Sequence, residues 1–323
     1  MKYLRHYKLF LFAVLASIAL VTKADNYPTT PIKIIVPWPP GGIVDIAARL
    51  IGQKVQGQIN QSLIIENVAG ATGSIGADKA IKANPDGYTL LFTTSALAMN
   101  AALTPKPPYN IVTDLVPIIM VATAPQILVI SNQSGITSLK QLIQIAKDNP
   151  DKLTYASAGN GSPAHFAAEL LKKNQGLSIT HVPYKGGPPA LLDQVAGRVD
   201  IQFANATAAL PFIKSGQLLA LAVTGSSRLT VLLDIPTISE LGINYKSEQW
   251  LGMFAPKGIS KEKVNFLSKQ IKQALNQIEL KEQLSINGMK IAPQNSPEQF
   301  STIIKEDYRR WQDLVLTAKI QAD

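Results

Sequence analysis

Two loops of this 323-residue chain combine residue types that can receive a negatively charged group. The first is Pro37-Trp38-Pro39-Pro40-Gly41-Gly42, between an apolar run and an amphipathic stretch. Its prolines have no backbone N–H, whereas Gly41 and Gly42 keep theirs and lack a Cβ that would hold an incoming group away. A helix beginning at Ile43 would direct its first amides and the positive end of its dipole to the same place. We therefore expect Gly41 and Gly42 to contact a carboxylate or a phosphate.

A second loop, residues 156–163, repeats this design with small residues that run from a strand into a helix. Ser162 is a favourable N-cap and Pro163 a favourable first helical residue, so a helix start is predicted there. The hydroxyls of Ser157 and Ser162, the amide of Asn160 and the glycine N–H groups are neutral donors for an anion. These residues form the second predicted ligand contact.

Two charged residues near these loops each allow two interpretations. Asp45 lies in the first turn of the helix predicted from Ile43, where an acidic residue stabilises the helix, and the alternative is that it contacts the ligand. Lys185 lies in a third loop of prolines and glycines, residues 183–189. It either attracts an anion or belongs to a solvated turn. Both residues are kept as candidate ligand contacts.

The sequence contains few residues for metal binding or nucleophilic catalysis. It has no cysteine and three histidines, and because His6 falls in a leader segment, only His165 and His181 are left for a zinc-type site. His165 and Glu169 are spaced for one helix face, but a third ligand is not in evidence. There is no Gly-x-Ser-x-Gly elbow and no Gly-x-x-x-x-Gly-Lys phosphate loop. We expect no metal and no cofactor.

Residues 159–164 have the glycine spacing of a dinucleotide-binding fingerprint, after a predicted strand and before a predicted helix. That motif needs an acidic residue about twenty residues further on. This chain has His181-Val182-Pro183-Tyr184-Lys185 there instead. Because the glycine spacing alone is a weak match, a nicotinamide or flavin site is disfavoured.

Apolar periodicity predicts that strands and helices alternate along most of the chain. Strands are expected at residues 32–36, 63–67, 88–93, 153–156, 179–182, 199–203, 219–224 and 250–255. Helices are expected at residues 74–83, 138–149, 163–173, 189–196 and 207–214. Three more are expected to begin at Ile43, Ser260 and Ser296, and the one from Ser260 has an apolar stripe from Val264 to Ile278. This β-α-β order predicts an α/β fold with parallel sheets.

The stretch from Leu115 to Ile130 is almost continuously apolar but contains Pro117 and Pro125. Because proline disrupts the interior of a helix, we expect two strands rather than one helix. The Pro125-Gln126 pair is the candidate hinge, since a second series of strands and helices begins beyond it. We therefore predict two α/β domains, one formed by residues 25–125 and 225–323 and the other by residues 126–224.

The first 24 residues are predicted to be a secretory signal peptide, because three basic residues precede an apolar run too short for a stable membrane anchor. Cleavage is expected after Ala24, with Ser17-Ile18-Ala19 as an alternative. Removal of this segment lowers the formal charge from +9 to +5. Because no block of five or six basic residues remains, nucleic acid is not an expected partner. We expect a periplasmic monomer.

Five separated motifs occur in a characteristic order. They are Pro37-Trp38-Pro39-Pro40-Gly41-Gly42-x-x-Asp45, Glu66-Asn67-x-x-Gly70-Ala71-x-Gly73, Asn84-Pro85-Asp86-Gly87, Ser157-x-Gly159-Asn160-Gly161-Ser162-x-x-His165 and Pro183-Tyr184-Lys185-Gly186. Together they resemble the extracytoplasmic solute receptors of tripartite tricarboxylate transporters, of the Bug type, over nearly the whole mature chain. The resemblance implies a type II periplasmic-binding-protein fold, with two α/β domains that close on a small carboxylated ligand in the cleft between them. It also implies delivery of that ligand to membrane permease subunits.

In that family, backbone amides, hydroxyls and bound water from the two loops hold the ligand carboxylate. Carried over to this chain, the resemblance implies ligand contacts at Gly41, Gly42, Ser157, Asn160 and Ser162, and less directly at Thr94, Lys185 and Asn205. Many relatives have an acid where this chain has Ala204, so a charged contact to a ligand amine is not implied here.

The resemblance does not identify the ligand, which we expect among di- and tricarboxylates, aromatic acids and amino acids. Two other functions stay open at this point. An exported enzyme could act on a small organic acid in the same cleft through Asp45 or Asp200. A receptor could instead report its ligand to a membrane signalling protein.

Overall fold

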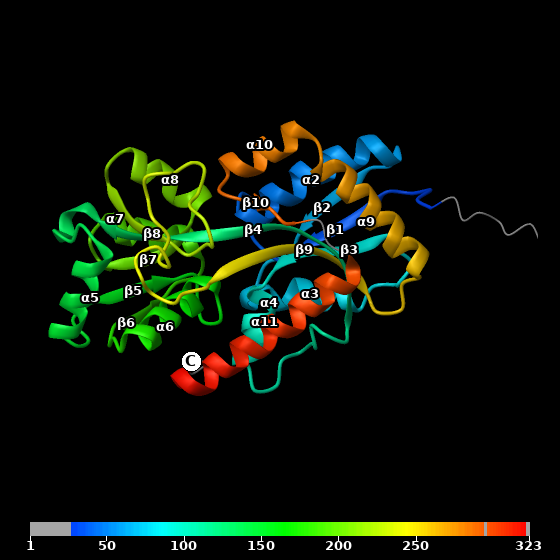
Figure 1. The fold of residues 1–323 in the computed structure, drawn as a ribbon. Helices are drawn as coiled ribbons and strands as arrows, with labels where there is room; N and C mark the ends of the chain where they lie inside the picture. Colours follow the sequence, from blue (N-terminus) through cyan, green and yellow to red (C-terminus); the bar gives the residue numbers. More distant parts are fainter. Residues whose placement is uncertain (1–26, 294–295, 321–323) are drawn as a thin grey trace, which may run out of the picture.

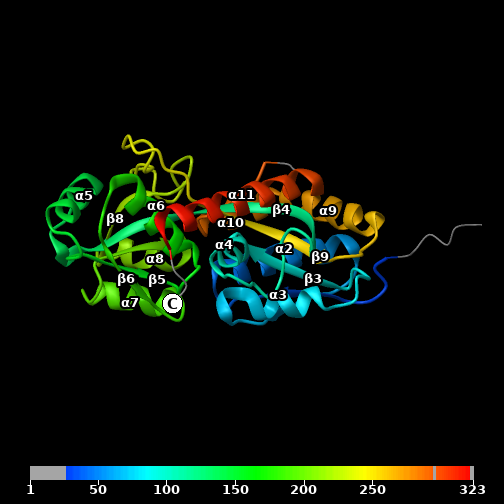
Figure 2. The same ribbon diagram turned by 90° about the horizontal axis from the view of Figure 1, so that it is seen from below.

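The computed structural model describes residues 27–293 and 296–320, so the predicted signal peptide and both cleavage sites lie outside the described residues. Two α/β halves lie end to end and are joined by two long strands, β4 (Leu115–Ser131) and β9 (Glu248–Pro256) (Figure 1, Figure 2). The strand order is β2-β1-β3-β9-β4-β7-β5-β6, with β8 and β10 also paired to β4.

The first half is a sheet covered on both faces. Its strands are β1 (Ile32–Val36), β2 (Leu63–Asn67), β3 (Thr89–Thr94), β10 (Lys290–Ile291), β9 and the first part of β4. One face packs against α2 (Ile43–Ile59), α9 (Lys261–Leu275) and α10 (Ile278–Ile286). The other packs against α3 (Ser74–Ile81), α4 (Ala96–Leu103) and α11 (Pro297–Ala318). Alternate residues of β1 reach opposite faces, Ile34 the first and Ile35 the second.

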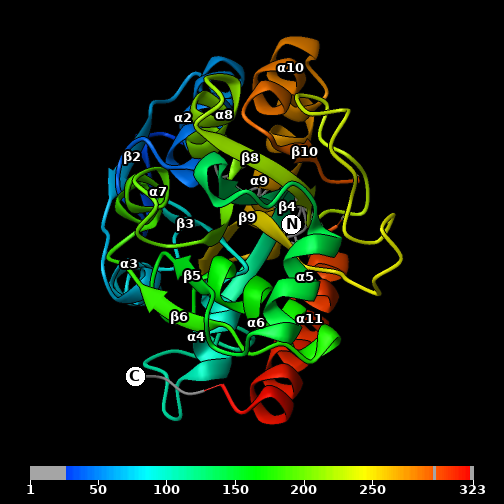
Figure 3. The same cartoon turned by 90° about the vertical axis from the view of Figure 1, so that its left-hand side faces the viewer.

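The second half has the same layered plan. Its strands are the end of β4, β5 (Thr154–Ser157), β6 (Thr180–Pro183), β7 (Ile201–Asn205) and β8 (Leu218–Val223). Its helices are α5 (Leu139–Asp148), α6 (Pro163–Gln175), α7 (Gly187–Val195) and α8 (Ala206–Lys214). Leu128 and Ile130 face α5 and α6, whereas Ile127 and Val129 face α7 and α8, so the two helix pairs cover opposite sides of the strands (Figure 3).

The prediction of parallel sheets is confirmed for β1 with β2 and β3, and for β5 with β6 and β7. It is wrong for the two joining strands, since β9 runs antiparallel to β3 and β4, and β4 antiparallel to β7 and β8. Strand β3 ends at Thr94, opposite Leu251, and β7 ends at Asn205, opposite Gln126. The carboxyl ends of the parallel strands in both halves therefore point at the junction between the halves, and the loops after them meet there.

The prediction of two strands between Leu115 and Ile130 is also wrong, because β4 is one strand of 17 residues. It changes sheets at the predicted hinge, where Pro125 pairs with Glu248 of β9 and Gln126 with Asn205 of β7. The register with β9 shifts just after Pro117. Proline has no backbone N–H to donate to a neighbouring strand. Such a donor is not needed at a β-bulge or where the partner strand changes, so both prolines fit inside β4.

Two helices differ from the sequence predictions. Helix α4 was not predicted, because its residues are apolar and mostly buried all round and give no amphipathic period. The apolar stripe expected to reach Ile278 ends earlier, since α9 stops at Leu275. Ile278 begins the separate helix α10 and is 73% exposed.

Candidate functional site

The first predicted loop, residues 37–42, ends on the start of α2. Gly42 is the N-cap residue, with φ −76° and ψ 165°, and no side chain caps the helix. The first N–H groups of any helix have no acceptor within the helix, so this uncapped end can receive an anion. Gly41 and Gly42 are exposed, and a Cβ placed on Gly41 would meet no atom within 4 Å.

Asp45 is almost fully buried beneath this loop and holds it in place. Its Oδ2 atom accepts hydrogen bonds from the Gly41 N–H at 2.9 Å and from Arg49 Nε at 3.0 Å, and its Oδ1 atom accepts one from Asn67 at 3.0 Å. Burial by itself would raise the pKa of Asp45, but the hydrogen bonds from Arg49, Gly41 and Asn67 together lower it below its ordinary value. The carboxylate is therefore ionised and engaged by the chain's own donors.

The second predicted loop, residues 156–163, runs into α6, which begins at Pro163. Ser162 caps this helix through a hydrogen bond of 3.4 Å from the His165 N–H. The Ser157 hydroxyl accepts a hydrogen bond from the Gly159 N–H at 3.1 Å and lies 2.7 Å from His181 Nε2. The hydroxyls of both serines thus fix the shape of the loop.

A short segment of the first half, η1 (Ala71–Gly73), lies between the two predicted loops and contacts both. The Trp38 ring lies against Gly73, with its Cζ2 atom 3.3 Å from where a Cβ would be. The adjacent Thr72 hydroxyl donates a hydrogen bond of 3.2 Å to the Asn160 carbonyl of the second half. The structure therefore places Trp38, Thr72 and Asn160 at one junction.

Thr72 was not predicted as a site residue, because the sequence analysis used Gly70, Ala71 and Gly73 only as part of a family motif. Its backbone has φ 50° and ψ 38°, a left-handed conformation that is unusual for a β-branched residue. Such strain is concentrated at functional segments. The signal in the sequence is the pair of glycines, Gly70 and Gly73, that brackets it.

The end of β3 supplies a third group of hydroxyls. Thr94 is 2% exposed, and its Oγ1 accepts a hydrogen bond of 3.2 Å from the Ala96 N–H at the start of α4. Thr93 and Ser95 are fully buried, and within residues 27–293 and 296–320 their hydroxyls have no hydrogen-bond partner. The sequence signal for this group is three consecutive hydroxyl residues directly before a helix. It was missed because α4 was not predicted.

Two other predicted contacts have different positions. Asn205 is the N-cap residue of α8, and its Oδ1 atom accepts a hydrogen bond of 2.8 Å from Gln249 on β9, which links the two halves. Lys185 is exposed on the loop after β6. The structure thus brings Asn205 to the junction and leaves Lys185 at the surface.

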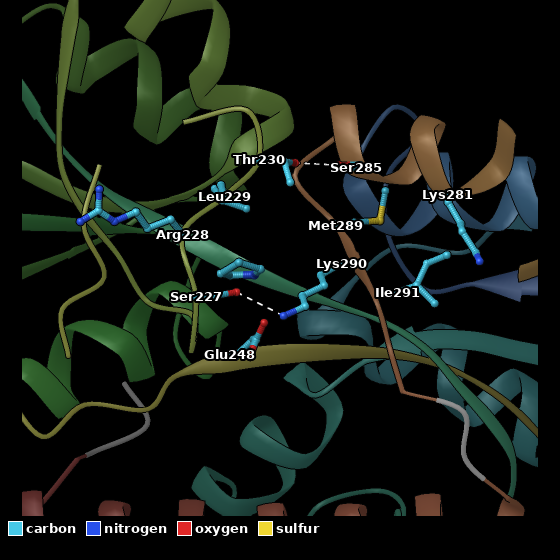
Figure 4. A pocket seen from close by; sticks show the side chains of 11 residues that line it. Ser227, Arg228, Leu229, Thr230, Glu248, Lys281, Ser285, Met289, Lys290 and Ile291 are labelled. Atoms are coloured by element: carbon cyan, nitrogen blue, oxygen red, sulfur yellow. Dashed lines mark hydrogen bonds between the residues drawn. The ribbon is translucent and has the colours of Figure 1, made fainter. Parts of the chain in front are cut away.

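A cavity of about 380 Å³ lies over the joining strands, and none of the predicted contacts lines it (Figure 4). Its floor includes Pro125 and Glu248, the last residue pair before β4 changes sheets. Its two sides are joined by a hydrogen bond between the hydroxyls of Thr230 and Ser285 and by one that Lys290 donates to Ser227. This cavity is therefore a feature of the joining strands and not of the predicted loops.

The carboxylates Asp200, considered for catalysis, and Glu169, considered for metal binding, have structural partners. Asp200 accepts hydrogen bonds from the N–H and hydroxyl of Thr154 at 2.7 and 2.8 Å. Glu169 accepts one from the Tyr155 hydroxyl at 2.6 Å and pairs with Lys172. Among the described residues, no three His, Asp or Glu side chains are grouped to hold a metal ion, and no helix is long and apolar enough to span a bilayer.

Comparison with known proteins identifies the family. Residues 47–320 match the tripartite tricarboxylate transporter family receptor. The chain belongs to this receptor family. BugT of Bordetella pertussis is 37% identical over 310 residues, which cover 94% of each chain.

Structures related to this receptor agree with that assignment. A Rhodopseudomonas palustris protein solved with adipate has a TM-score of 0.85 and 32% identity, over 91% of this chain and 99% of its own. MatC from the same organism, solved with malate, has a TM-score of 0.81 and 30% identity, over 90% and 100%. The predicted family and periplasmic-binding-protein fold are confirmed, and this receptor is a solute-binding protein rather than an enzyme. Receptors of this family are periplasmic.

Proposed function

We propose that this receptor captures a small dicarboxylate between its two halves, with one carboxylate at the start of α2 and the other at the start of α6. The observation that carries the proposal is the contact of η1 with both loops, through Trp38 and Gly73 on one side and Thr72 and Asn160 on the other. Support comes from the adipate and malate found with the two related proteins.

The ligand contacts proposed from the sequence act in this arrangement as follows. Gly42 and the amides after it bind the first carboxylate, while Gly41 and Asp45 hold that loop in shape through their mutual hydrogen bond. Ser157, Asn160 and Ser162 form the second proposed set of ligand contacts. Ser157 and Ser162 are 0% and 1% exposed and bond within the loop, so a ligand would have to displace those contacts to reach their hydroxyls. Thr94 and Asn205 lie at the strand ends that border the junction, and Lys185 acts from the surface by attracting anions.

The magnitudes are sufficient without a buried cation. A charge at a helix end contributes about 0.3 to 2 kcal/mol, and each hydrogen bond to a charged group about 1.5 to 3 kcal/mol. Four such bonds, after ordering costs, can reach the roughly 8 kcal/mol that corresponds to a micromolar Kd.

Capture also requires motion, and we propose the Pro125–Gln126 bond as the hinge. The predicted units are residues 25–125 with 225–323 and residues 126–224. Because Leu229, Ile238 and Tyr245 pack into the cores of the second half, residues 229–245 would move with 126–224. The signal peptide would direct the receptor to the periplasm, where it passes its ligand to the permease subunits of a tripartite tricarboxylate transporter.

Calorimetric titration of the receptor tests this function. We expect adipate or malate to bind with micromolar Kd, a matched monocarboxylate such as butyrate to bind at least tenfold more weakly, and the bound acid to be recovered unaltered. Equal affinity for the monocarboxylate and the dicarboxylate would exclude a site that binds both carboxylates of the ligand at once. Absence of binding by any di- or tricarboxylate, aromatic acid or amino acid would overturn carboxylate capture altogether.

A further inference from the structure

The cavity over the joining strands has no role in ligand capture as proposed above. Its volume of about 380 Å³ lies in the range of roughly 300 to 1,000 Å³ that small-molecule sites have. One wall belongs to the first half, because it includes Met289, which packs into that half's core, and Lys290 of β10. The opposite wall is residues 227–230, whose Leu229 packs into the core of the second half. The cavity therefore spans the hinge, and a movement of the halves would change its shape.

The lining of the cavity carries a surplus of positive charge. Lys281, Lys290 and Arg228 line it together with one carboxylate, that of Glu248. Arg228 forms an ion pair of 3.1 Å with Glu240, which lies outside the lining. Within residues 27–293 and 296–320, the two lysines form no ion pair. A negatively charged ligand is therefore favoured.

The cavity offers hydrogen-bond donors and an apolar surface to such a ligand. Lys290 Nζ donates a hydrogen bond of 3.2 Å to the Ser227 hydroxyl on the opposite wall (Figure 4). Because an ammonium group has three donors, Lys290 keeps donors for a ligand oxygen. The hydroxyls of Thr230 and Ser285 meet at 2.6 Å, and Leu229 adds apolar surface. These groups suit a small molecule with one oxyanion group and an apolar body, a chemistry that carboxylates and phosphate monoesters share.

Two short routes connect the cavity to the proposed ligand site, and both reach the start of α8. On the first, the lining residue Glu248 precedes Gln249, whose amide donates a hydrogen bond of 2.8 Å to Asn205. On the second, Gly288 comes directly before the cavity wall of the first half, and a Cβ on it would overlap the Cβ of Ala206. Asn205 is a proposed ligand contact and the N-cap residue of α8. A change in the cavity would therefore move groups that border the proposed ligand site.

The two halves are in contact both at the ligand loops and at the cavity. Thr72 of the first half donates a hydrogen bond to the Asn160 carbonyl of the second, while Lys290 donates one to Ser227. An anion that accepts hydrogen bonds from both walls of the cavity would hold the halves in this same arrangement. Two ligands that favour one arrangement strengthen each other's binding.

We propose that this cavity, the hinge cavity, is a second binding site for a small organic oxyanion with an apolar body, and that its occupation strengthens dicarboxylate capture. Lys281 and Lys290 supply the positive charge, and the hydroxyls of Ser227, Thr230 and Ser285 supply further donors. The binding step is independent of the proposed function, whereas the strengthening rests on it. The receptor would then respond to two solutes instead of one.

Calorimetric titration with phenyl phosphate and with hexanoate tests the site, because these probes carry the two types of oxyanion on an apolar body. We expect at least one to bind the wild-type receptor, and the tighter one identifies the type. The double variant Lys281→Gln with Lys290→Gln should bind that probe about tenfold more weakly, since it loses charge-assisted hydrogen bonds, and should bind adipate as before. The control Lys140→Gln with Lys147→Gln removes the same charge from exposed positions of α5 and should change neither affinity.

Titration of adipate into receptor saturated with the probe tests the strengthening. The adipate Kd should fall about fivefold in the wild type and in the control, at the lower end of usual couplings between sites, and should not change in the double variant. Hydrogen–deuterium exchange of the wild type with the probe should show protection at residues 227–230 and 285–291. This measurement decides the site if the double variant does not fold.

The two parts of the proposal fail in different ways. The second site would be overturned if neither probe bound, if wild type and double variant bound the probe equally, or if protection were confined to residues 41–45 and 157–165. An unchanged or higher adipate Kd in the probe-saturated wild type would overturn the strengthening alone. If neither adipate nor malate bound, dicarboxylate capture would fall, and the probe titration would still decide the hinge cavity.

Discussion

Replacement of Asp45 by Asn tests whether a buried carboxylate shapes the first ligand loop. Asp45 accepts hydrogen bonds from Gly41, Arg49 and Asn67, and the amide of Asn would turn a donor toward at least one of them. Hydrogen bonds to a charged group contribute about 1.5 to 3 kcal/mol each, but Arg49 is 52% exposed and its ion pair contributes less than about 1 kcal/mol. We expect a loss of about 2 kcal/mol in the free energy of unfolding.

The same substitution should weaken ligand binding, because the Gly41 N–H loses its acceptor and the loop before α2 is no longer held. We expect about a tenfold higher Kd for adipate, which corresponds to about 1.4 kcal/mol. The measurements are thermal unfolding without ligand and calorimetric titration with it. Since the lowered pKa of Asp45 stabilises the fold only while the carboxyl is ionised, the wild type should lose this advantage as the pH falls below about 4 and approach the Asn variant.

Asp200→Asn is the matched control. Asp200 also accepts two hydrogen bonds from the chain, both from Thr154. It directly precedes β7 and lies beside the first residue of β5, whereas the second ligand loop follows the last residue of β5. We expect a similar loss of stability and an unchanged Kd. The reasoning would be refuted if Asp45→Asn lowered the melting temperature but bound adipate as tightly as the wild type. A loss of binding beyond a hundredfold with unchanged melting temperature would instead show that Asp45 contacts the ligand directly.

Two glycine substitutions test the closeness of the halves. Gly161→Ala would place a Cβ 3.1 Å from the side chain of Asn100, so we expect adipate to bind about fivefold more weakly. Gly176→Ala is the control: its φ is similar and a Cβ there has no neighbour within 4 Å, so this variant should lose only stability. Gly288→Ala would bring its Cβ into overlap with the Cβ of Ala206 from the other half, so small-angle scattering should show a larger radius of gyration than for Gly176→Ala. Equal behaviour of the three variants in both measurements would mean that the contacts between the halves do not control closure.

Local patterns in the sequence predicted the elements well and their assembly less well. The caps Ser162 and Ser296 marked the starts of α6 and α11 correctly, because a capping side chain acts within its own first turn. The course of β4 was missed, since two prolines look like breaks unless the partner strands are known.

The site shows the same division between local and distant information. The glycines and hydroxyls of the two loops were evident because strand-to-helix junctions of this composition have a known chemistry. Thr72 was not, since its contact with Asn160 joins residues 88 apart in the chain. Helix α4 was hidden by its own burial, and with it the hydroxyls of Thr93 and Ser95.

The position of Trp38 makes the ligand loops optically observable. The chain has three tryptophans, of which Trp250 and Trp311 are 3% and 1% exposed, whereas Trp38 is half-buried against Gly73. Its emission should respond to solvent changes at the loops. Trp311 makes an edge-to-face contact with Phe166 of the other half, so its emission should change when the halves separate. Variants that retain one of these indoles would give label-free fluorescence signals for loop occupancy and for opening, and stopped-flow mixing could time the two events separately.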